Sequence, residues 1–264
     1  MKTVVLTSFD ENYYEYAPVL VRSFSDNYHS DKIQDFYCLV PEKLLSLQDD
    51  FINRVGNVKN LNIKFVCAPD YIQFEKDAKK INIIGEGHFW LSRHAMHRVF
   101  MIQVLDGFDK AIYIDPDTIV LRDVKPLLEY PMYNKFVACV EVHDFDNHLT
   151  ESQDDIYFAD GVFIADLNFW RVSGMHYKMK DYIYNNPIPP FMDQDIFNLF
   201  FMPYLQNMPL RFNTYPIYLK EPLLAQHTEN PLIAHFVGWE KPWRDVESNK
   251  YIDLWRDAYN RLKA

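Results

Sequence analysis

The sequence predicts an α/β fold in which a sheet carries helices on both faces. Two observations carry this prediction. Short apolar runs of strand length alternate along the chain with segments of helical periodicity. The 264 residues are also 48% hydrophobic, enough to bury one substantial core, and they show no repeat or linker. We therefore predict a single domain spanning residues 1–264.

The elements are predicted in chain order from runs and periodicity. The apolar run after Lys2 predicts the first strand, and apolar residues at three- and four-residue spacing from Glu42 to Val55 predict an amphipathic helix. The predicted strands are Val4–Leu6, Phe36–Val40, Asn62–Val66, Lys110–Ile114, Phe136–Glu141 and Gly161–Asp166. The predicted helices are Tyr14–Phe24, Glu42–Val55, Phe89–Leu105 and a closing helix that contains Ile252, Trp255, Tyr259 and Leu262.

Charge and cysteine content exclude several classes of partner. A formal net charge of -10 disfavours nucleic acid and anionic membrane surfaces. No segment approaches the ~20 apolar residues of a membrane helix, so no membrane span is predicted. Cys38, Cys67 and Cys139 lie far apart without CxxC spacing, which indicates neither a zinc cluster nor a disulfide framework. A reducing compartment, and hence a cytoplasmic location, is expected.

The tripeptide Asp115-Pro116-Asp117 follows a predicted buried strand directly. Two carboxylates at the carboxyl end of such a strand are hard oxygen ligands at the edge where open α/β sheets bind their ligands. The pattern therefore points to a metal site. By itself, it also suits a solvated turn whose bend is fixed by the proline.

Two common nucleotide-binding motifs are not present. The predicted first strand is followed by Thr7-Ser8-Phe9-Asp10 instead of a glycine-rich turn. Gly85-Glu86-Gly87 lacks the third glycine and an adjoining strand, and the P-loop pattern is missing. A nicotinamide-binding enzyme is therefore not indicated.

Five segments in order make the chain resemble glycosyltransferase family 8, retaining enzymes of GT-A fold. The segments are Val4 to Ser8 with Asn12-Tyr13, Lys110 to Thr118, Tyr157 to Phe163 with Trp170, Asp193 to Asn198, and His235 to Trp243. The resemblance covers nearly the whole chain. It implies a Rossmann-like mixed sheet flanked by helices, a nucleotide-sugar half over about residues 1–120, and an acceptor half with a C-terminal helix over about 121–264.

The resemblance assigns the metal site. It implies that Asp115, Asp117 and His235 hold Mn²⁺, with Mg²⁺ as the alternative, against the phosphates of a nucleotide-sugar. Two carboxylates and an imidazole leave about three positions on an octahedral ion for phosphate and water oxygens. Lys241 would stabilise the charge that grows on the leaving phosphate, and Gly238 would let the backbone approach it.

The resemblance also assigns donor-binding and reacting residues. Asp193 would accept hydrogen bonds from the donor sugar and Gln194 would lie near its reacting face, with Lys241 as the third catalytic residue. An alternative is that Asp193 caps a helix beginning at Ile196. The implied donor-binding residues are Thr7, Ser8, Tyr13, Arg98, Asp115, Asp117, Asp160, Gly238 and Lys241.

Two positions depart from the family pattern. Ala159 occupies a place where the family often has Asn, with Asp160 beside it, so donor-sugar recognition is expected to differ. Phe9 occupies the place of an acidic residue that contacts uracil in many members, with Asp10 next to it. A uridine nucleotide is still expected, with uracil as its base.

The function predicted from these residues is a metal-dependent, retaining glycosyltransferase. It would move a hexose from a nucleotide-sugar, expected to be a UDP-sugar, to a glycan or glycoconjugate acceptor. Retention would come from front-face attack, which the resemblance favours, or from double displacement. The alternatives are a non-catalytic nucleotide-sugar binding protein of the same fold and an Asp-x-Asp phosphatase of haloacid dehalogenase type. The phosphatase pattern expects Thr or Val where this chain has Ile119.

Overall fold

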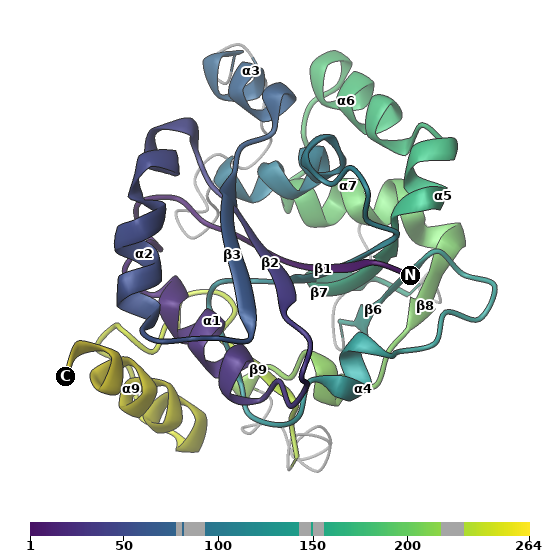
Figure 1. The fold of residues 1–264 in the computed structure, drawn as a ribbon. Helices are drawn as coiled ribbons and strands as arrows, with labels where there is room; N and C mark the ends of the chain where they lie inside the picture. Colours follow the sequence, from purple (N-terminus) through teal and green to yellow (C-terminus); the bar gives the residue numbers. More distant parts are fainter. Residues whose placement is uncertain (78–80, 82–92, 143–148, 150–155, 218–229) are drawn as a thin grey trace.

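The computed structural model describes residues 1–77, 81, 93–142, 149, 156–217 and 230–264 (Figure 1). Its centre is a seven-stranded mixed sheet in the order β3-β2-β1-β4-β7-β6-β8. The first four of these strands are parallel, and β7 runs antiparallel to both β4 and β6. The strands are β1 (Thr3–Ser8), β2 (Gln34–Leu39), β3 (Leu61–Val66), β4 (Lys110–Ile114), β6 (Val137–Glu141), β7 (Phe158–Asp166) and β8 (Leu205–Asn207). The predicted mixed α/β fold is confirmed.

Helices cover both faces of the sheet. Along β1, Val4 and Leu6 enter one hydrophobic cluster and Val5 enters the other, as the two-residue period of a strand requires. The first cluster draws on α3 (Pro69–Asp77), the 3-10 helix η2 (Arg93–Val104), α5 (Leu167–Val172), α6 (Met175–Asn185) and α7 (Met192–Phe201). The second draws on α1 (Ala17–Asp26), the 3-10 helix η1 (Glu42–Leu47), α2 (Gln48–Val55), α4 (Lys125–Leu128) and the 3-10 helix η4 (Leu210–Phe212). Figure 1 shows α3 and α6 on the opposite side of the fold from α1 and α9 (Lys250–Lys263).

The helix boundaries differ from prediction in three places. The first helix begins at Ala17 instead of Tyr14, because Tyr13 to Tyr16 form a turn and Pro18 favours the first helical turn. The segment Glu42–Val55 starts as the 3-10 helix η1 and becomes α-helical only at Gln48. Of the predicted Phe89–Leu105 helix, residues 89–92 lie outside the described residues, and the rest is the 3-10 helix η2. The predicted closing helix is confirmed as α9.

A two-stranded ribbon lies outside the main sheet and was not predicted. β5 (Thr118–Val120) pairs antiparallel with β9 (Ile233–His235), in a register that sets Thr118 opposite His235. Buried residues of the ribbon pack against α1 and α9. The ribbon thus brings residues more than 110 positions apart in the sequence side by side. None of the described helices is long and apolar enough to cross a bilayer.

Candidate active site

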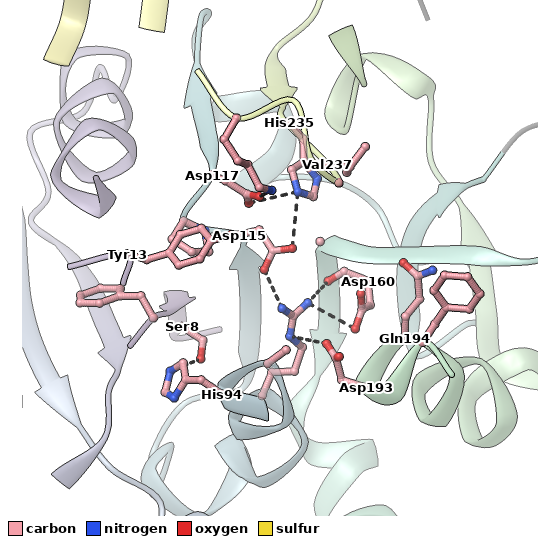
Figure 2. A pocket seen from close by; sticks show the side chains of 18 of the residues that line it. Ser8, Tyr13, His94, Asp115, Asp117, Asp160, Asp193, Gln194, His235 and Val237 are labelled. Atoms are coloured by element: carbon pink, nitrogen blue, oxygen red, sulfur yellow. Dashed lines mark hydrogen bonds and ion pairs between the residues drawn. The ribbon is translucent and has the colours of Figure 1, made fainter. Parts of the chain in front are cut away.

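A cavity of about 320 Å³ opens where β1 and β4 end, at Ser8 and Ile114 (Figure 2). This is the carboxyl edge of parallel strands, where α/β sheets bind ligands. Residues from both halves of the chain line it. The lining residues are Ser8, Phe9, Asp10, Tyr13, His94, Ala95, Arg98, Asp115, Pro116, Asp117, Val142, Asp160, Gly161, Phe191, Asp193, Gln194, Tyr215, His235, Val237, Gly238 and Lys241.

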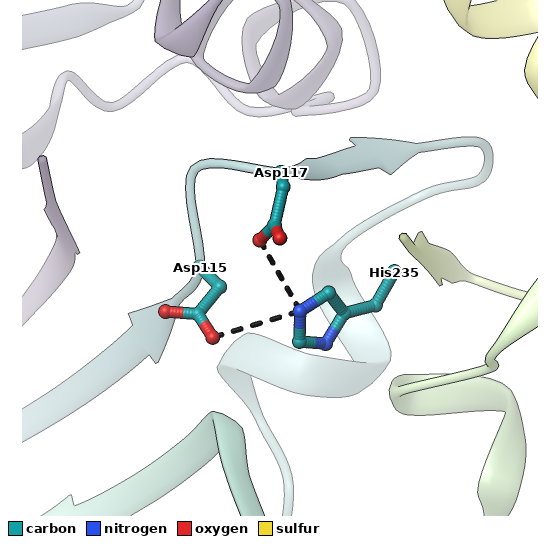
Figure 3. A group of neighbouring side chains, drawn as sticks. All are labelled: Asp115, Asp117 and His235. Carbon is teal, nitrogen blue, oxygen red and sulfur yellow. Dashed lines mark ion pairs between the residues drawn. The ribbon is translucent and has the colours of Figure 1, made fainter. Parts of the chain in front are cut away.

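Asp115, Asp117 and His235 form a compact group on one wall (Figure 3). One ligand atom from each lies within 4.8 Å of the others. His235 Nε2 is 3.2 Å from Asp117 Oδ1 and 3.6 Å from Asp115 Oδ2. All three side chains are at least 85% shielded from solvent, because their exposed fractions are 15%, 9% and 5%. This donor set suits Mn²⁺ or Mg²⁺.

Main-chain pairing creates this group. Asp115 N donates to Gly161 O at 2.8 Å, and Thr118 Oγ1 donates to Asp115 O at 2.8 Å, which closes the Asp-x-Asp turn. Phe236 N donates to Asp117 O at 3.0 Å and extends the ribbon past His235. The acidic pair and the histidine are therefore fixed by strand register.

Gly161 provides the space that the group needs. A Cβ atom at this position would lie 2.3 Å from His235 Cε1 and 2.7 Å from Asp115 Oδ2. Contacts this short are not tolerated, so any side chain here would displace the histidine or the carboxylate. The glycine after Asp160 is thus a requirement of the site.

Asn213 fixes the orientation of the His235 ring. His235 Nδ1 and Asn213 Oδ1 are 2.9 Å apart, and an amide oxygen only accepts, so Nδ1 is the donor. In the neutral ring Nε2 then carries a lone pair and faces two carboxylate oxygens. Three acceptors facing one another require a cation or a proton between them, which is how the residues fit a metal ion.

Lys241 pairs with Asp117 and donates to Phe236 O at 2.7 Å. Its side chain is buried, with the ammonium 6.0 Å from the centroid of the Tyr13 ring. Burial acts to raise the pKa of Asp117, but Lys241 and His235 outweigh it and hold that pKa below its usual range. We call Asp115, Asp117, His235 and Lys241 the metal end of the cavity.

Arg98 joins this metal end to a second group of acids. Its Nη2 donates to Asp115 at 2.7 Å, its Nη1 lies 3.3 Å from Asp160 Oδ2, and its Nε lies 3.1 Å from Asp193 Oδ2. Nη1 also donates to Asp160 O at 3.0 Å, and the guanidinium stacks 4.3 Å from the Tyr113 ring. Figure 2 labels the three aspartates that Arg98 contacts, Asp115, Asp160 and Asp193. We call Arg98, Asp160, Asp193 and Gln194 the sugar end.

Asp193 does not cap a helix, contrary to one of the two roles considered for it. Helix α7 begins at Met192, so Asp193 lies in its first turn, and the N-cap residue Phe191 makes no side-chain cap. Met192 has a positive φ of 48°, which is costly for a residue with a side chain and redirects the chain just before Asp193. The Asp193 carboxylate faces Arg98 instead.

Side chains of α7 fasten the sugar end to β7. Asp195, fully buried, accepts from Tyr157 OH at 2.5 Å and from Phe191 N at 2.8 Å. Asn198 bonds both the N and the O of Phe158, at 2.9 and 2.8 Å. These bonds hold the start of α7, and thus Asp193, against the strand.

A bulge in β7 turns Asp160 towards Arg98. The register with β6 runs from Cys139 opposite Phe163 to Val140 opposite Ala159, which leaves the residues between Ala159 and Phe163 without partners on β6. Bulges of this kind redirect side chains. Asp160 lines the cavity, whereas Ala159 is buried and does not, so the acid faces the site. Burial raises the pKa of Asp160 well above its usual range.

The end of β1 presents Ser8 and Asp10 to the cavity. Ser8 Oγ lies 2.9 Å from His94 Nε2, and His94 Nδ1 lies 2.9 Å from Tyr71 OH. Burial lowers the pKa of His94 to about 4, so the ring is neutral at pH 7. Phe9 borders the cavity and stacks on Phe51 at 5.2 Å, and Asp10 beside it also lines the cavity and accepts from Asn12 N. An acidic residue is therefore available at this place despite Phe9.

Almost all of the predicted site residues meet in this cavity. Ser8, Tyr13, Arg98, Asp115, Asp117, Asp160, Asp193, Gln194, His235, Gly238 and Lys241 line it. Thr7 does not: it is fully buried, and its Oγ1 has no hydrogen-bond partner within the described ranges. Sequence reasoning missed His94 and Asn213, since neither belongs to a motif. It gave Gly161 no role, although Gly161 lies in a quoted segment.

Comparison with known proteins identifies the family. A family model described as Glycosyl transferase family 8 matches residues 4–247. General stress protein A of Bacillus subtilis (strain 168) is 29% identical over 214 residues, 74% of each chain. A lipopolysaccharide 1,2-glucosyltransferase of Escherichia coli is 20% identical over 95% of this chain and 76% of its own.

Solved structures share the fold. The galactosyltransferase LgtC, solved in complex with donor and acceptor sugar analogues, superposes with a TM-score of 0.71 at 18% identity, over 98% of this chain and 96% of its own. The bifunctional glycosyltransferase WbbM superposes with a TM-score of 0.75 at 21% identity. The chain covers 98% of its own length in that match but spans only 49% of WbbM. The shared architecture is that of the GT-A glycosyltransferases.

Proposed function

Since the chain belongs to glycosyl transferase family 8 and is a glycosyltransferase, we propose that it transfers a hexose from a UDP-sugar to a glycan acceptor, with a divalent metal ion and retention of anomeric configuration. Mn²⁺ is the proposed ion and Mg²⁺ the alternative. No specific observation favours the phosphatase, or a binding protein without turnover, over this function.

The observation that carries the proposal is the metal end. Asp115, Asp117 and His235 offer three ligand atoms within 4.8 Å, and the buried ammonium of Lys241 lies beside them on Asp117. Four carboxylates of the two ends face two cationic side chains, Arg98 and Lys241. Acidic side chains thus outnumber cationic ones here, and a divalent cation held by Asp115, Asp117 and His235 would favour the charged forms of these acids.

The residues of the metal end suit the departure of a nucleoside diphosphate. A bound divalent ion would act as a Lewis acid towards the diphosphate oxygens. Lys241 would add a fixed positive charge where negative charge grows, in a site with little water to reorganise. Gly238, with φ 66°, has open space around its Cβ position, so phosphate oxygens can approach its backbone.

The sugar end suits a hexose held for attack. Asp193 and Gln194 line the cavity on α7, and Arg98 holds the Asp193 carboxylate at 3.1 Å. Such a carboxylate accepts hydrogen bonds from sugar hydroxyls, and Gln194 offers both a donor and an acceptor. The proposed retention is tested by the anomeric configuration of the product, read by NMR.

The wall near β1 suits uridine. Tyr13 offers a ring that packs perpendicular to the Trp243 ring, with 5.4 Å between the centroids, and Asp10 lines the cavity two residues after the end of β1. A carboxylate accepts a hydrogen bond from the N–H of uracil, whereas it meets a lone pair at the equivalent atom of cytosine.

The cytoplasmic location stays a prediction.

Nucleotide release tests the proposal. The purified chain is incubated with UDP-, GDP- and TDP-sugars in Mn²⁺, in Mg²⁺ or in EDTA, and the nucleoside diphosphate released is measured. We expect slow release from one UDP-hexose that depends on the metal ion. The double variant Asp115→Asn, Asp117→Asn keeps the side-chain shapes and should lose this release.

Binding in the same samples separates the outcomes. UDP that binds with Mn²⁺ but is never released from any UDP-sugar, with a range of glycan acceptors present, would favour the non-catalytic binding protein. Turnover that survives EDTA, or the double variant, would contradict the metal-dependent mechanism.

A further inference from the structure

The segment between the cavity and helix α9 follows an irregular course. Lys241 lines the cavity, and α9 begins shortly after it, at Lys250. The described residues in between, 242–249, form turns, bends and loop and belong to no helix or strand. Regular secondary structure does not pair the carbonyl groups of such a segment, so other groups must do so. Whatever fixes this segment also fixes the backbone next to Lys241.

Arg256 of α9 holds this segment through hydrogen bonds. Its Nε donates to Pro242 O at 2.8 Å, and its Nη2 donates to Arg244 O at 2.9 Å. Its Nη1 donates to Ser248 Oγ at 3.4 Å. All three nitrogen atoms of the guanidinium therefore serve one segment. A planar group with several fixed donors suits this task, whereas the single ammonium of a lysine does not.

Aromatic rings hold the same segment through its tryptophan. Trp243 stacks on Tyr16, with 4.3 Å between the ring centroids. The Trp243 ring also lies 5.4 Å from the ring of Tyr13, which lines the cavity, and 5.4 Å from that of Trp255 on α9. The segment is thus fixed twice, by its backbone on Arg256 and by the side chain of Trp243.

The place of Lys241 depends on this segment. Its buried ammonium pairs with Asp117 and donates to Phe236 O at 2.7 Å. Its backbone O accepts from Arg244 N at 3.0 Å. Arg256 therefore holds the residue that follows Lys241, Pro242, and also the residue that bonds the Lys241 carbonyl. The long lysine side chain has many conformations, so a fixed backbone is needed to keep its ammonium in one place.

We propose that Arg256, which is not among the residues lining the described cavity, is a positioning residue for Lys241. It keeps the lysine backbone where the ammonium meets Asp117 at the metal end. Without Arg256 the segment loosens, the ammonium leaves its buried place, and nucleotide release slows. The effect on release rests on the proposed function, whereas the position of Lys241 can be measured independently of it.

Acetylation of Lys241 measures this position. The chain is treated briefly with acetic anhydride in buffer with Mn²⁺, and the modification of each lysine is quantified by mass spectrometry. A buried lysine reacts only when its surroundings open. In Arg256→Ala we expect Lys241 to react at least about 10-fold faster than in the unaltered chain, because the hydrogen bonds that hold its segment are lost. Exposed Lys59, before β3, should react at the same rate in both chains.

Two further variants serve as controls. Arg261→Ala removes an exposed arginine from the same helix and changes the net charge equally, so Lys241 should react at the unaltered rate. Arg256→Lys keeps the positive charge but lacks the planar fork of donors, so it should still raise the rate by at least about 3-fold. If Arg256→Ala does not fold, as circular dichroism would show, Arg256→Lys carries the test.

Nucleotide release is the second readout. With a UDP-hexose and Mn²⁺, Arg256→Ala should lower kcat by about 10–100-fold, since a shift of about 1 Å at a catalytic group costs about 10²-fold. The same change made in a Lys241→Met chain should lower kcat by less than about 3-fold, because a residue that acts through Lys241 then has nothing left to position. A general loss of stability would not depend on Lys241 in this way. Where Lys241→Met is too slow to measure, acetylation decides.

The outcomes separate the two claims. If Arg256→Ala folds and Lys241 still reacts at the unaltered rate, or if the two losses in kcat are additive, the inference is wrong while the proposed function stands. If Lys241 reacts faster but UDP binds with neither Mn²⁺ nor Mg²⁺ and no UDP-sugar is turned over, the positioning stands and the proposed function fails.

Discussion

The metal end and the sugar end of the cavity are joined by one side chain, Arg98, yet they are built differently. Strand pairing fixes the metal end: β4 on β7 sets Asp115 beside Gly161, and β5 on β9 sets Thr118 opposite His235. Side-chain bonds from η2, the β7 bulge and α7 fix the sugar end. We infer that the backbone specifies where the metal is held, whereas individual side chains decide which sugar is held.

Two aspartate variants should separate the ends most strongly. Asp117→Asn removes a ligand and the partner of Lys241, so we expect loss of turnover by about 10³-fold or more together with loss of metal-dependent UDP binding. Asp193→Asn should lower turnover by about 10²-fold and leave UDP binding within about 3-fold. Release assays and calorimetry with UDP measure the two effects. Equal loss of UDP binding in both variants would show that the ends are not separate.

Alanine is the less suitable change at Asp117. The residue is buried and pairs with buried Lys241, so it is not the simple loop position that the Asp-x-Asp motif suggests. Removing one member of a buried ion pair costs about 3–5 kcal/mol. We expect Asp117→Ala to have a lower melting temperature than Asp117→Asn. This measurement would check that the asparagine variant loses turnover through its missing ligand and not through unfolding.

Gly161→Ala tests whether backbone geometry alone builds the metal end. The added Cβ would lie 2.3 Å from His235 Cε1, so His235 or Asp115 must move. A shift of about 1 Å at a catalytic group costs about 10²-fold, and we expect a loss of that size in metal-dependent release. Gly107→Ala has open space around the new Cβ but a φ of 79°, so it controls for general destabilisation. An active Gly161→Ala enzyme would contradict the steric requirement.

Most of the main sheet could be predicted from the sequence because its strands are buried and apolar. Lys110–Ile114 is predicted with its observed bounds, and its five residues are all buried. The strands that were missed, β5, β8 and β9, have three residues each, too short to show a period. The 3-10 geometry of η2 was also missed, since its apolar periodicity resembles that of an α-helix.

The site could be predicted only where a motif marks it. Asp115 and Asp117 stand out because they follow a strand, and His235 and Asp193 stand out through the family resemblance. Asn213 carries no such signal, because its role depends on the ribbon that places His235 at 2.9 Å from it. The three-way contact of Arg98 likewise depends on tertiary structure, since its partners come from three separate segments.

Asn213→Ala should affect the metal end less than Asp117→Asn does. Without the Asn213 oxygen the His235 ring loses the partner that keeps its proton on Nδ1. Changes to groups that orient a metal-binding histidine typically cost 10–100-fold in metal affinity, and we expect a loss in this range. Titration of Mn²⁺ against UDP binding measures it. Unchanged Mn²⁺ affinity would mean that strand register alone orients the ring.

Of these variants, His94→Gln should have the smallest effect on the metal end and the sugar end, because His94 lies in the cavity wall outside both. Burial lowers the pKa of His94 to about 4 in the folded chain, against about 6.5 when unfolded. The unfolded chain therefore binds more protons as pH falls from 6.5 to 4, and the folded state loses up to about 3 kcal/mol over that window. Above pH 6.5 the imidazole is neutral in both states and this loss does not occur.

Glutamine cannot titrate, so the stability of His94→Gln should fall less steeply with acid. Urea unfolding at pH 7 and pH 4.5 measures the free energy of unfolding of both chains. The difference between the variant and the unaltered chain should shift by about 2 kcal/mol in favour of the variant at the lower pH. His97, also buried with a lowered pKa, is present in both chains and cancels in the comparison. If both chains lose the same free energy of unfolding at pH 4.5, His94 gains a proton without cost, and Ser8 is held next to a charged ring. The end of β1 would then carry a positive charge beside the cavity, and the contrast between the two ends would have to include it.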